Sequence, residues 1–369
     1  MTRKPEGALR RGWTTGACAT AATKAAYTAL LTGHFPDPVT ITLPKGEQPA
    51  FALARETLAE GQASAAIVKD AGDDPDVTHL ALVQATLRPG PQGSGVTFTA
   101  GPGVGTVTKP GLPLAVGEPA INPVPRRMMQ AVVAEVAIDH GGSGDVEIEI
   151  SVDGGEDLAK KTWNPRLGIL GGLSILGTTG VVVPFSCSAW IHSIHRGIDV
   201  ARATGITHAA GCTGSTSEAA VQQLYGLPEA ALLDMGDFAG GLLKYLRLHP
   251  LPRLTLAGGF GKLCKLAAGH LDLHSGRSQV DFDLLAALLG ELGAAPELAA
   301  QARAANTAKQ VLDLATAAGL PLADAVAARA RETALGVLSR RNANSETAVE
   351  VLVFDRAGNL AGKAAGWPQ

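Results

Sequence analysis

The feature that most constrains the fold is a change of rhythm near Asn164. From there on, short apolar segments that end in glycine alternate with segments of helical periodicity, a pattern typical of βα units on a parallel sheet. A charge-free run at residues 167–191 opens this half, but five glycines and Pro184 interrupt it. Because buried parallel strands read as continuous apolar runs, it predicts buried strands joined by glycine loops, not a membrane span.

The first half of the chain has a different pattern. Residues 14–31 and 126–137 have helical character, and Thr14 or Thr15 is a suitable N-cap for the first helix. Period-two alternation predicts strands between them and beyond, at residues 39–44, 51–54, 63–70, 79–87, 95–101 and 146–152. The sequence therefore predicts an α+β domain at residues 1–163. A parallel α/β domain with a helical C-terminal part and a final strand is expected at residues 164–369.

Composition supports this division and excludes several partners. A chain of 369 residues is too long for one core of the usual size. Its 31 Lys and Arg against 34 Asp and Glu give no reason to expect nucleic acid, and no basic amphipathic run suggests a membrane surface. The four cysteines lack disulfide or metal spacing, so we expect a reducing, cytoplasmic setting. A homo-oligomer is compatible with this composition.

An acidic stretch at residues 68–79, VKDAGDDPDVTH, follows one expected strand and precedes another. Its four aspartates and one histidine suit a metal site, a proton-transfer site or a well-capped turn. The turn is the better reading for Asp74 and Asp76, because Asp side chains bond local N–H groups. Asp70 and Asp73 stand at the strand end and are candidate catalytic carboxylates. Lys69 and His79 flank them and are candidate substrate-binding residues.

Positively charged residues lie in and after a long glycine- and proline-rich loop that starts at Gly101. A loop of that length inside a compact domain is usually functional. Its positive residues and those after it are Lys109, Arg126, Arg127, Lys160 and Lys161. Together they suit a ligand with several carboxylates or phosphates, although ordinary surface charge explains any single one of them.

Three glycine loops, at residues 171–180, 211–214 and 258–261, each follow an expected strand and precede a helix. Ligands of open parallel sheets bind at those carboxyl ends, yet none of the loops is a P-loop or a clean GxGxxG. The candidate cofactor-binding residues in them are Gly171, Gly172, Gly177, Thr178, Thr179, Gly180, Gly211, Gly258, Gly259 and Gly261. Lys262, His270 and His274 follow as candidate substrate-binding residues, and no histidine pair has zinc spacing, so no metal site is expected.

Several long segments together resemble one known family, the cobalt-precorrin-5B C1-methyltransferases of the anaerobic cobalamin pathway. The matching segments are RRGWTTGACATAATKAA, VKDAGDDPDVTH, GVGTVTKPGLPLAVGEPAINPVPRRM, GGEDLAKKTWNPRLGILGGLSILGTTGVVVP and GKLCKLAAGHLDLHS. They span residues 10–275. Three second-domain segments, at residues 211–215, 259–262 and 273–275, depart from the family's usual pattern.

The resemblance implies a permuted ribosomal-S5-like α+β domain followed by a Rossmann-like domain. It also implies transfer of a methyl group from S-adenosylmethionine to ring carbon C1 of a polycarboxylate cobalt-corrinoid, cobalt-precorrin-5B, which gives cobalt-precorrin-6A. The glycine loops would then hold the cofactor, and Asp234 is the best-placed acceptor for its ribose hydroxyls. The cations would pair with the substrate's peripheral carboxylates.

Two alternatives stay open. S5-like domains also occur in small-molecule kinases, where the acidic stretch would bind magnesium, but the serine-rich phosphate loop of such kinases is missing. A non-catalytic corrinoid carrier is the other alternative, but such carriers usually show a cobalt-ligating DxHxxG loop, which this sequence lacks.

Overall fold

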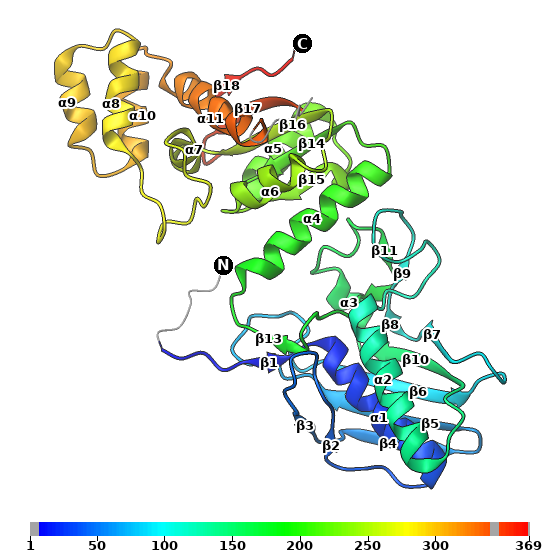
Figure 1. The fold of residues 1–369 in the computed structure, drawn as a ribbon. Coiled ribbons are helices and arrows are strands. Elements are labelled where there is room, and N and C mark those ends of the chain that lie inside the picture. Colours follow the sequence, from blue (N-terminus) through cyan, green and yellow to red (C-terminus); the bar gives the residue numbers. More distant parts are fainter. Residues whose placement is uncertain (1–6, 340–346, 368–369) are drawn as a thin grey trace. The chain divides into compact units, whose positions relative to one another are not determined.

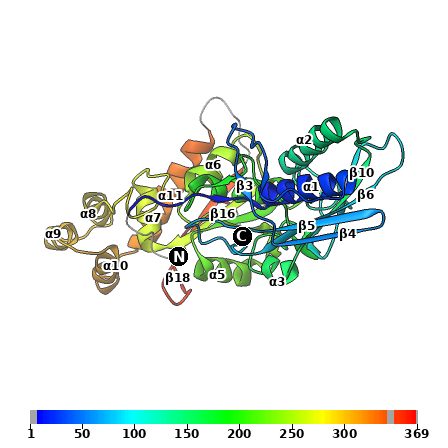
Figure 2. The same ribbon diagram turned by 90° about the horizontal axis from the view of Figure 1, so that it is seen from below.

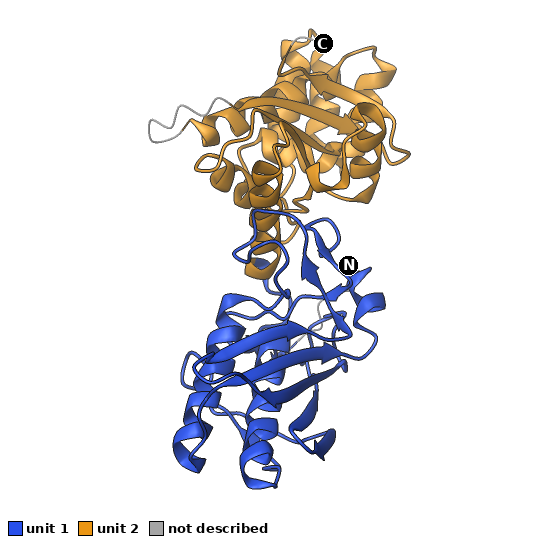
Figure 3. Cartoon of the chain, turned by 90° about the vertical axis from the view of Figure 1, so that its right-hand side faces the viewer, with its two compact units in different colours: residues 1–187 blue, residues 188–369 orange. Residues whose placement is uncertain are grey.

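The computed structural model describes residues 7–339 and 347–367. The chain forms two compact units, Met1–Cys187 and Ser188–Gln369 (Figure 3). The expected boundary at residue 163 therefore lies too early. Residues 164–187 belong to the first unit because their strands pair within it, as described below. Among the described residues, no helix is both long and apolar enough to cross a membrane.

The first unit is built on a five-stranded sheet (Figure 1). Its order is β4 (Arg55–Ala59), β5 (Gln62–Val68), β6 (Leu82–Pro89), β10 (Val146–Val152) and β7 (Val96–Ala100). All neighbours are antiparallel except β10 and β7, which run parallel. In β10, buried and half-buried residues alternate, as a sheet with one covered face requires.

Two helices of equal length cover that sheet, α1 (Thr15–Thr32) and α2 (Pro123–His140) (Figure 2). They pack on each other, and α1 packs on β5 and β6. Alanines fill the side of α1 that meets the sheet and α2, so the backbones approach closely. Thr14 caps the helix, its Oγ1 accepting from the Ala17 amide. The expectation of a capped, alanine-rich helix is confirmed.

The charge-free run forms three two-residue strands of the first unit. They are β11 (Ile169–Leu170), β12 (Gly172–Leu173) and β13 (Val181–Val182). Each pairs with an earlier strand of the same unit, in the order β9 (Thr106–Val107), β8 (Gly103–Val104) and β1 (Gly12–Trp13). The expectation that this run begins the parallel sheet of the second domain is therefore wrong. Another two-stranded pair joins β2 (Val39–Thr40) to β3 (Ala50–Phe51), and a short helix, α3 (Gly155–Ala159), lies between β10 and β11.

The second unit contains the expected parallel sheet. Its order is β15 (Leu232–Asp234), β14 (His208–Cys212), β16 (Arg253–Gly259), β17 (Ala348–Phe354) and β18 (Leu360–Ala364). The first four strands are parallel, and β18 is antiparallel to β17. The βα rhythm after residue 203 is thus confirmed, while β18 was not foreseen.

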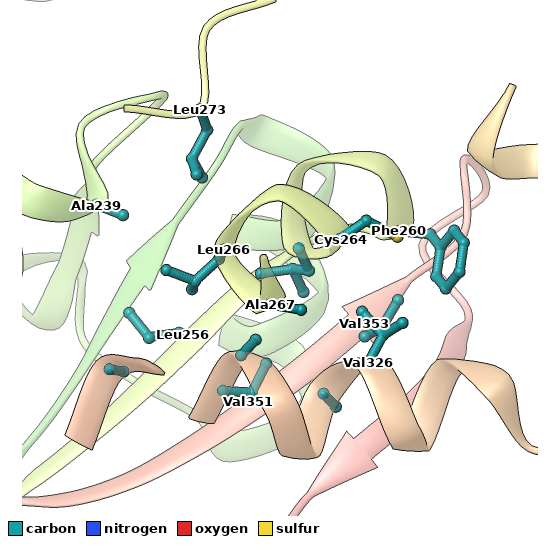
Figure 4. Packing of buried hydrophobic residues seen from close by; sticks show 14 of the residues in the cluster. Ala239, Leu256, Phe260, Cys264, Leu266, Ala267, Leu273, Val326, Val351 and Val353 are labelled. Carbon is teal, nitrogen blue, oxygen red and sulfur yellow. The ribbon is translucent and has the colours of Figure 1, made fainter. Parts of the chain in front are cut away.

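Helices cover both faces of this sheet. One face packs on α5 (Ser215–Tyr225), through Val221 and the strand residues Ala210, Ala257 and Leu352. The other face carries α4 (Cys187–Ala203), α6 (Ala239–Leu246), α7 (Phe260–Ala267) and α11 (Leu322–Leu338). Figure 4 shows Leu266 of α7 and Val326 of α11 in this core together with Val351 and Val353 of β17. The helical part adds α8 (Phe282–Glu291), α9 (Pro296–Arg303) and α10 (Ala308–Ala317).

The chain leaves the neighbouring strands β14 and β16 in opposite directions. From β14 it passes through α5 to β15 on one side, and from β16 it passes through α7 and the following helices to β17 on the other. This divergence is a topological switch point, and ligands of open α/β sheets bind beside the carboxyl ends of such strands. The fold therefore indicates a ligand site at residues 212–215, 234–237 and 258–262, which we call the switch-point loops.

Candidate functional site

Lys262 holds the switch-point loops together. Its Nζ donates to the carbonyl oxygen of Thr213, at 2.8 Å, and lies 3.1 Å from Oδ1 of Asp237. Thr213 follows β14, Asp237 follows β15, and Lys262 lies in the first turn of α7 after β16. One ammonium group therefore ties the loops of three adjacent strands.

The glycines of these loops have unequal roles. A Cβ at Gly258 would lie 2.6 Å from Oγ1 of Thr213, and a Cβ at Gly211 would lie 2.4 Å from the Leu242 side chain. Both glycines are therefore required by protein packing. In contrast, nothing lies within 4 Å of a Cβ at Gly214 or Gly259, so the space beside these two residues is open to a ligand.

Asp234, the expected ribose acceptor, ends β15 at the same edge of the sheet. Its carbonyl oxygen accepts a hydrogen bond from Nε1 of Trp190 on α4, at 2.9 Å. The loop beyond it is fixed by the amides of Met235 and Gly236, which both donate to the Cys212 carbonyl oxygen. The switch-point loops thus share a backbone network that holds Asp234 and Asp237 in place.

The glycine loop at residues 171–180 has a structural role in the first unit. The amide of Gly16, at the start of α1, donates to the Leu176 carbonyl oxygen, and the Thr14 amide donates to that of Gly180. A Cβ at Gly177 would lie 2.3 Å from Oγ1 of Thr14. The loop therefore satisfies the N-terminal amides of α1. Gly172 is also packed, against the Gly103 backbone, whereas Gly171 and Thr178 are exposed and the Thr179 hydroxyl bonds locally to Val181.

The acidic stretch fastens the N-terminal segment to the first unit. Both terminal nitrogens of the Arg10 guanidinium donate hydrogen bonds to the Asp70 carboxylate, with Nη2 2.9 Å from Oδ1. The Arg10 amide donates to Oδ2 of Asp73, at 2.6 Å, and the Asp73 amide returns a bond to the Arg10 carbonyl oxygen. Both candidate catalytic carboxylates are thus partners of Arg10.

The remaining acidic side chains also have protein partners. Lys69, only 1% exposed, donates to Oδ2 of Asp76 at 2.6 Å, and Oδ1 of Asp76 accepts from the amide and hydroxyl of Thr78. Asp74 accepts from the Phe185 amide at 2.7 Å. The expectation that Asp76 stabilises a turn is confirmed, whereas for Asp74 it is wrong, because Asp74 accepts an amide 111 positions away and not a local one. His79 accepts the Ala71 amide at Nδ1, which leaves Nε2 as the protonated nitrogen of the neutral ring.

These partners keep two of the carboxyl groups ionised. Hydrogen bonds from Arg10 and then from the Gly72 amide lower the pKa of Asp70 to about 2. Burial raises the pKa of Asp76, but the charge and hydrogen bonds of Lys69 and Thr78 outweigh it and leave that pKa below its ordinary value. A carboxyl group with so low a pKa is a weak base near neutral pH. Asp70 is better suited to accept a hydrogen bond as a fixed anion.

The candidate cations of the first unit differ in how far they are already engaged. Arg126 pairs with Glu118 at 2.8 Å, donates to two backbone carbonyls and lies over the Phe98 ring. Lys160 pairs with Asp157 on the surface. Lys109 is half-buried, and Arg127 and Lys161 are exposed. Among the described residues, these last three have no ion pair, so they are the cations most available to an anionic ligand.

Two of the candidate histidines, His270 and His274, lie in the second unit. His270 and His274 are exposed near the end of α7, and the Nδ1 of His274 accepts the Gly276 amide. His195 stacks on Tyr245, with ring centroids 3.9 Å apart. Within residues 7–339 and 347–367, no three His, Cys, Asp or Glu side chains converge in a way that would hold a metal ion.

Sequence reasoning missed Arg10, Thr213 and Asp237. Asp237 gave a local signal, because it follows the apolar strand LLD by three positions, in the same kind of loop that made Asp234 a candidate. No local signal in the sequence pointed to Arg10, because its partner Asp70 lies 60 positions away. Thr213 acts through its backbone carbonyl, which any residue would supply.

Comparison with known proteins identifies the family. The model of the CbiD family matches residues 2–184, and that of the CbiD C-terminal domain matches residues 272–365. The chain belongs to the CbiD family.

Relatives match over nearly their whole length. A protein of Paramagnetospirillum magneticum is 65% identical, over 97% of this chain and 99% of its own. A relative from Brucella anthropi is 63% identical, over 95% of this chain and 95% of its own. A relative from a Bradyrhizobium species is 61% identical, over 97% of this chain and 94% of its own. All three are named cobalt-precorrin-5B C(1)-methyltransferase. A crystal structure of the cobalamin biosynthesis protein CbiD from Archaeoglobus fulgidus is 28% identical, over 74% of this chain and 84% of that one, with a TM-score of 0.41.

Proposed function

We propose that this chain is a methyltransferase that methylates C1 of cobalt-precorrin-5B and gives cobalt-precorrin-6A in cobalamin biosynthesis. The observation that carries the proposal is identity of 61–65% with relatives of that name over nearly the full chain. Identity that extends through both units leaves little room for a change of reaction. The relatives' names imply a methyl donor, and we take it to be S-adenosylmethionine.

The proposed donor site is formed by the switch-point loops of the second unit. S-adenosylmethionine carries no phosphate, which agrees with glycine loops that lack P-loop spacing. The open space at Gly214 and Gly259 supports a ligand against the backbone there, with Asp234 as acceptor for the ribose hydroxyls. Gly211 and Gly258 then shape the loops, and Gly261 remains a candidate cofactor-binding residue. Residues 171–180 are not part of the proposed donor site, because they belong to the first unit.

The chemistry is a direct displacement. The ring carbon attacks the methyl carbon of the sulfonium, the carbon–sulfur bond breaks, and its electron pair leaves with the neutral thioether. Because no group of the protein forms a bond in this step, the protein's main task is to bind both reactants in line. Asp70 and Asp73 are our candidate carboxylates beside the ring, Asp70 as a fixed anion and Asp73 as the acceptor of a proton as C1 becomes nucleophilic.

We propose that the available cations of the first unit bind the substrate's peripheral carboxylates. Lys109, Arg127 and Lys161 have no ion pair within the described residues, and each can pair with an acetate or propionate side chain. Lys160, His79, His270 and His274 are secondary candidates. Arg126 and Lys69 support the fold through their own partners, and we assign them to the surroundings of the site.

We also propose that the first unit is a permuted ribosomal-S5-like domain and the second a Rossmann-like domain. The mixed sheet covered by α1 and α2 supports the first assignment. Four parallel strands with helices on both faces and a switch point support the second. A structural alignment that pairs the strands in another order would contradict either assignment.

Label transfer tests the proposed reaction. The protein is incubated with methyl-labelled S-adenosylmethionine and cobalt-precorrin-5B, and the tetrapyrrole is followed by mass spectrometry. We expect one labelled methyl group per ring. A tetrapyrrole without label, from a protein that binds both compounds, would contradict the proposal.

A further inference from the structure

The ion pair of Lys262 and Asp237 has unused bonding capacity at the switch point. The Lys262 side chain is 35% exposed and that of Asp237 is 12% exposed. An ammonium group has three N–H donors; within the described residues Lys262 makes one hydrogen bond, to the Thr213 carbonyl oxygen, and its contact with Asp237 is an ion pair without a directed hydrogen bond. A donor is therefore left over on a side chain that solvent still reaches.

The carboxylate is also incompletely bonded. Oδ1 of Asp237 is buried, and although Lys262 lies 3.1 Å away, the directions do not make a hydrogen bond. A buried carboxylate oxygen without a well-directed donor is costly, because it has lost water and gained little in return. A ligand that supplies an N–H donor to the exposed part of this carboxylate would offset that cost.

A zwitterion fits both requirements. An amino acid has an ammonium and a carboxylate on the same carbon, so it can meet Asp237 with one group and Lys262 with the other. A phosphate or a dicarboxylate would gain from Lys262 but would be repelled by Asp237. The pair also lies beside the N-termini of α5 and α7, which favour a carboxylate over a second ammonium at that edge.

We propose that Lys262 and Asp237 bind the amino-acid end of the methyl donor, Lys262 its α-carboxylate and Asp237 its α-ammonium. This inference rests on the proposed function, since it takes S-adenosylmethionine as the donor. It moves Lys262, expected from the sequence to bind the substrate, to the donor site. It also assigns a role to Asp237, which the sequence reasoning did not single out.

The test removes one charge at a time from both partners and measures binding by calorimetry. Three ligands share the adenosine and thioether groups: S-adenosylhomocysteine has both charges, its decarboxylated analogue keeps the ammonium, and 5′-methylthioadenosine has neither. Lys262→Met should weaken S-adenosylhomocysteine about 10- to 150-fold, the range for hydrogen bonds to charged groups. It should leave the other two ligands within about twofold, since neither has the carboxylate.

Asp237→Asn should show a different selectivity. Affinity for S-adenosylhomocysteine and for the decarboxylated analogue should both fall, while 5′-methylthioadenosine is unaffected. Lys309→Met is the matched control, because Lys309 pairs with Asp313 on the exposed surface of α10 at 2.5 Å, and it should change none of the affinities. Thermal unfolding of each variant reports on its fold.

Three results are decisive. If the variants lose affinity for all three ligands alike, the pair only shapes the loops, and the inference is wrong. If they bind S-adenosylhomocysteine as the unmodified protein does, the amino-acid end binds elsewhere, and the inference is again wrong while the proposed function stands. If the unmodified protein binds neither S-adenosylhomocysteine nor S-adenosylmethionine, the donor itself is misassigned and the proposed function fails first.

Discussion

At the scale of single residues, the aspartates of the acidic stretch stabilise the fold of the first unit, although their charge suggested a reactive site. Asp70, Asp73, Asp74 and Asp76 each accept a hydrogen bond from a group in the same unit. The residue types predicted a turn or a reactive site, but the partners at residues 10 and 185 lie far away in the sequence. Local pattern carries no information on such pairs, so this part of the site could not be derived from the sequence.

The pairing of Asp70 with Arg10 should make stability depend on pH in the acid range. The folded pKa, about 2, lies below the ordinary value of 3.8, so the unfolded chain binds more protons between these values. The stabilisation is complete above about pH 4 and is lost as pH falls toward about 2. Asp70→Asn should therefore flatten this part of a plot of denaturation midpoint against pH.

The control for this experiment is Asp139→Asn, at an exposed position on α2. It should leave the acid-range dependence unchanged. An Asp70→Asn protein with the same pH profile as the unmodified chain would show that the Arg10 contact contributes nothing in solution.

The same carboxylates can be tested in the reaction. Turnover at neutral pH should fall by about 10²-fold or more in Asp70→Asn or Asp73→Asn if the substituted carboxylate contacts the ring. Normal turnover in both Asp→Asn variants would leave this stretch with a structural role alone.

Two adjacent arginines allow a direct test of the substrate cations. Arg127 is exposed, whereas Arg126 is bound to Glu118, to backbone carbonyls and to the Phe98 ring. Arg127→Ala should raise KM for the tetrapyrrole about 10- to 150-fold, from the loss of a charged pair worth about 1.5–3 kcal/mol. Its unfolding temperature should not change. Arg126→Ala should instead lower the unfolding temperature. The assignment fails if Arg127→Ala has a normal KM.

At the scale of elements, glycine loops with similar sequences have different roles. The loop at residues 171–180 accepts the first amides of α1, while the loop after β16 borders open space at Gly259. Both follow a strand and precede a helix, so the sequence pattern treated them alike. The difference is set by which strands pair with which, and β11, β12 and β13 are too short for periodicity to reveal their partners.

Matched substitutions should separate the two roles. Gly259→Thr fills open space at φ −71° and keeps a residue type that caps helices, so the fold should be preserved and donor affinity should drop at least tenfold. Gly177→Thr puts a side chain at φ +131° against Thr14. It should destabilise the first unit by about 2 kcal/mol or more. Calorimetry and thermal unfolding measure the two effects. Unchanged donor affinity in Gly259→Thr would remove this loop from the site.

The elements themselves were largely predictable. Long periodic segments such as α1, α2, β10 and the βα units from residue 203 onward were expected within a few residues of their bounds. Strand β4 and the C-terminal strand β18 were missed. Every residue of β4 is exposed, and the sequence of β18, LAGKA, shows no period-two alternation although its Gly362 is buried.

At the scale of the whole molecule, the chain consists of two units with separate cores. Two domains followed from length and from the change of rhythm, but the boundary was misplaced because an apolar run was taken as the start of the second sheet. The candidate site was predictable where it follows from topology, at the carboxyl ends of parallel strands. It was not predictable where it depends on contacts such as that of Lys262 with Asp237.

The position of the transferred methyl group tests the central claim most directly. Cobalt-precorrin-5B is converted with [methyl-13C]-S-adenosylmethionine, and the labelled carbon is located in the product by 13C NMR. We predict a single labelled methyl on C1, formed in proportion to the S-adenosylhomocysteine released. A label on any other ring carbon, or S-adenosylhomocysteine released without a labelled ring, would contradict the proposed function.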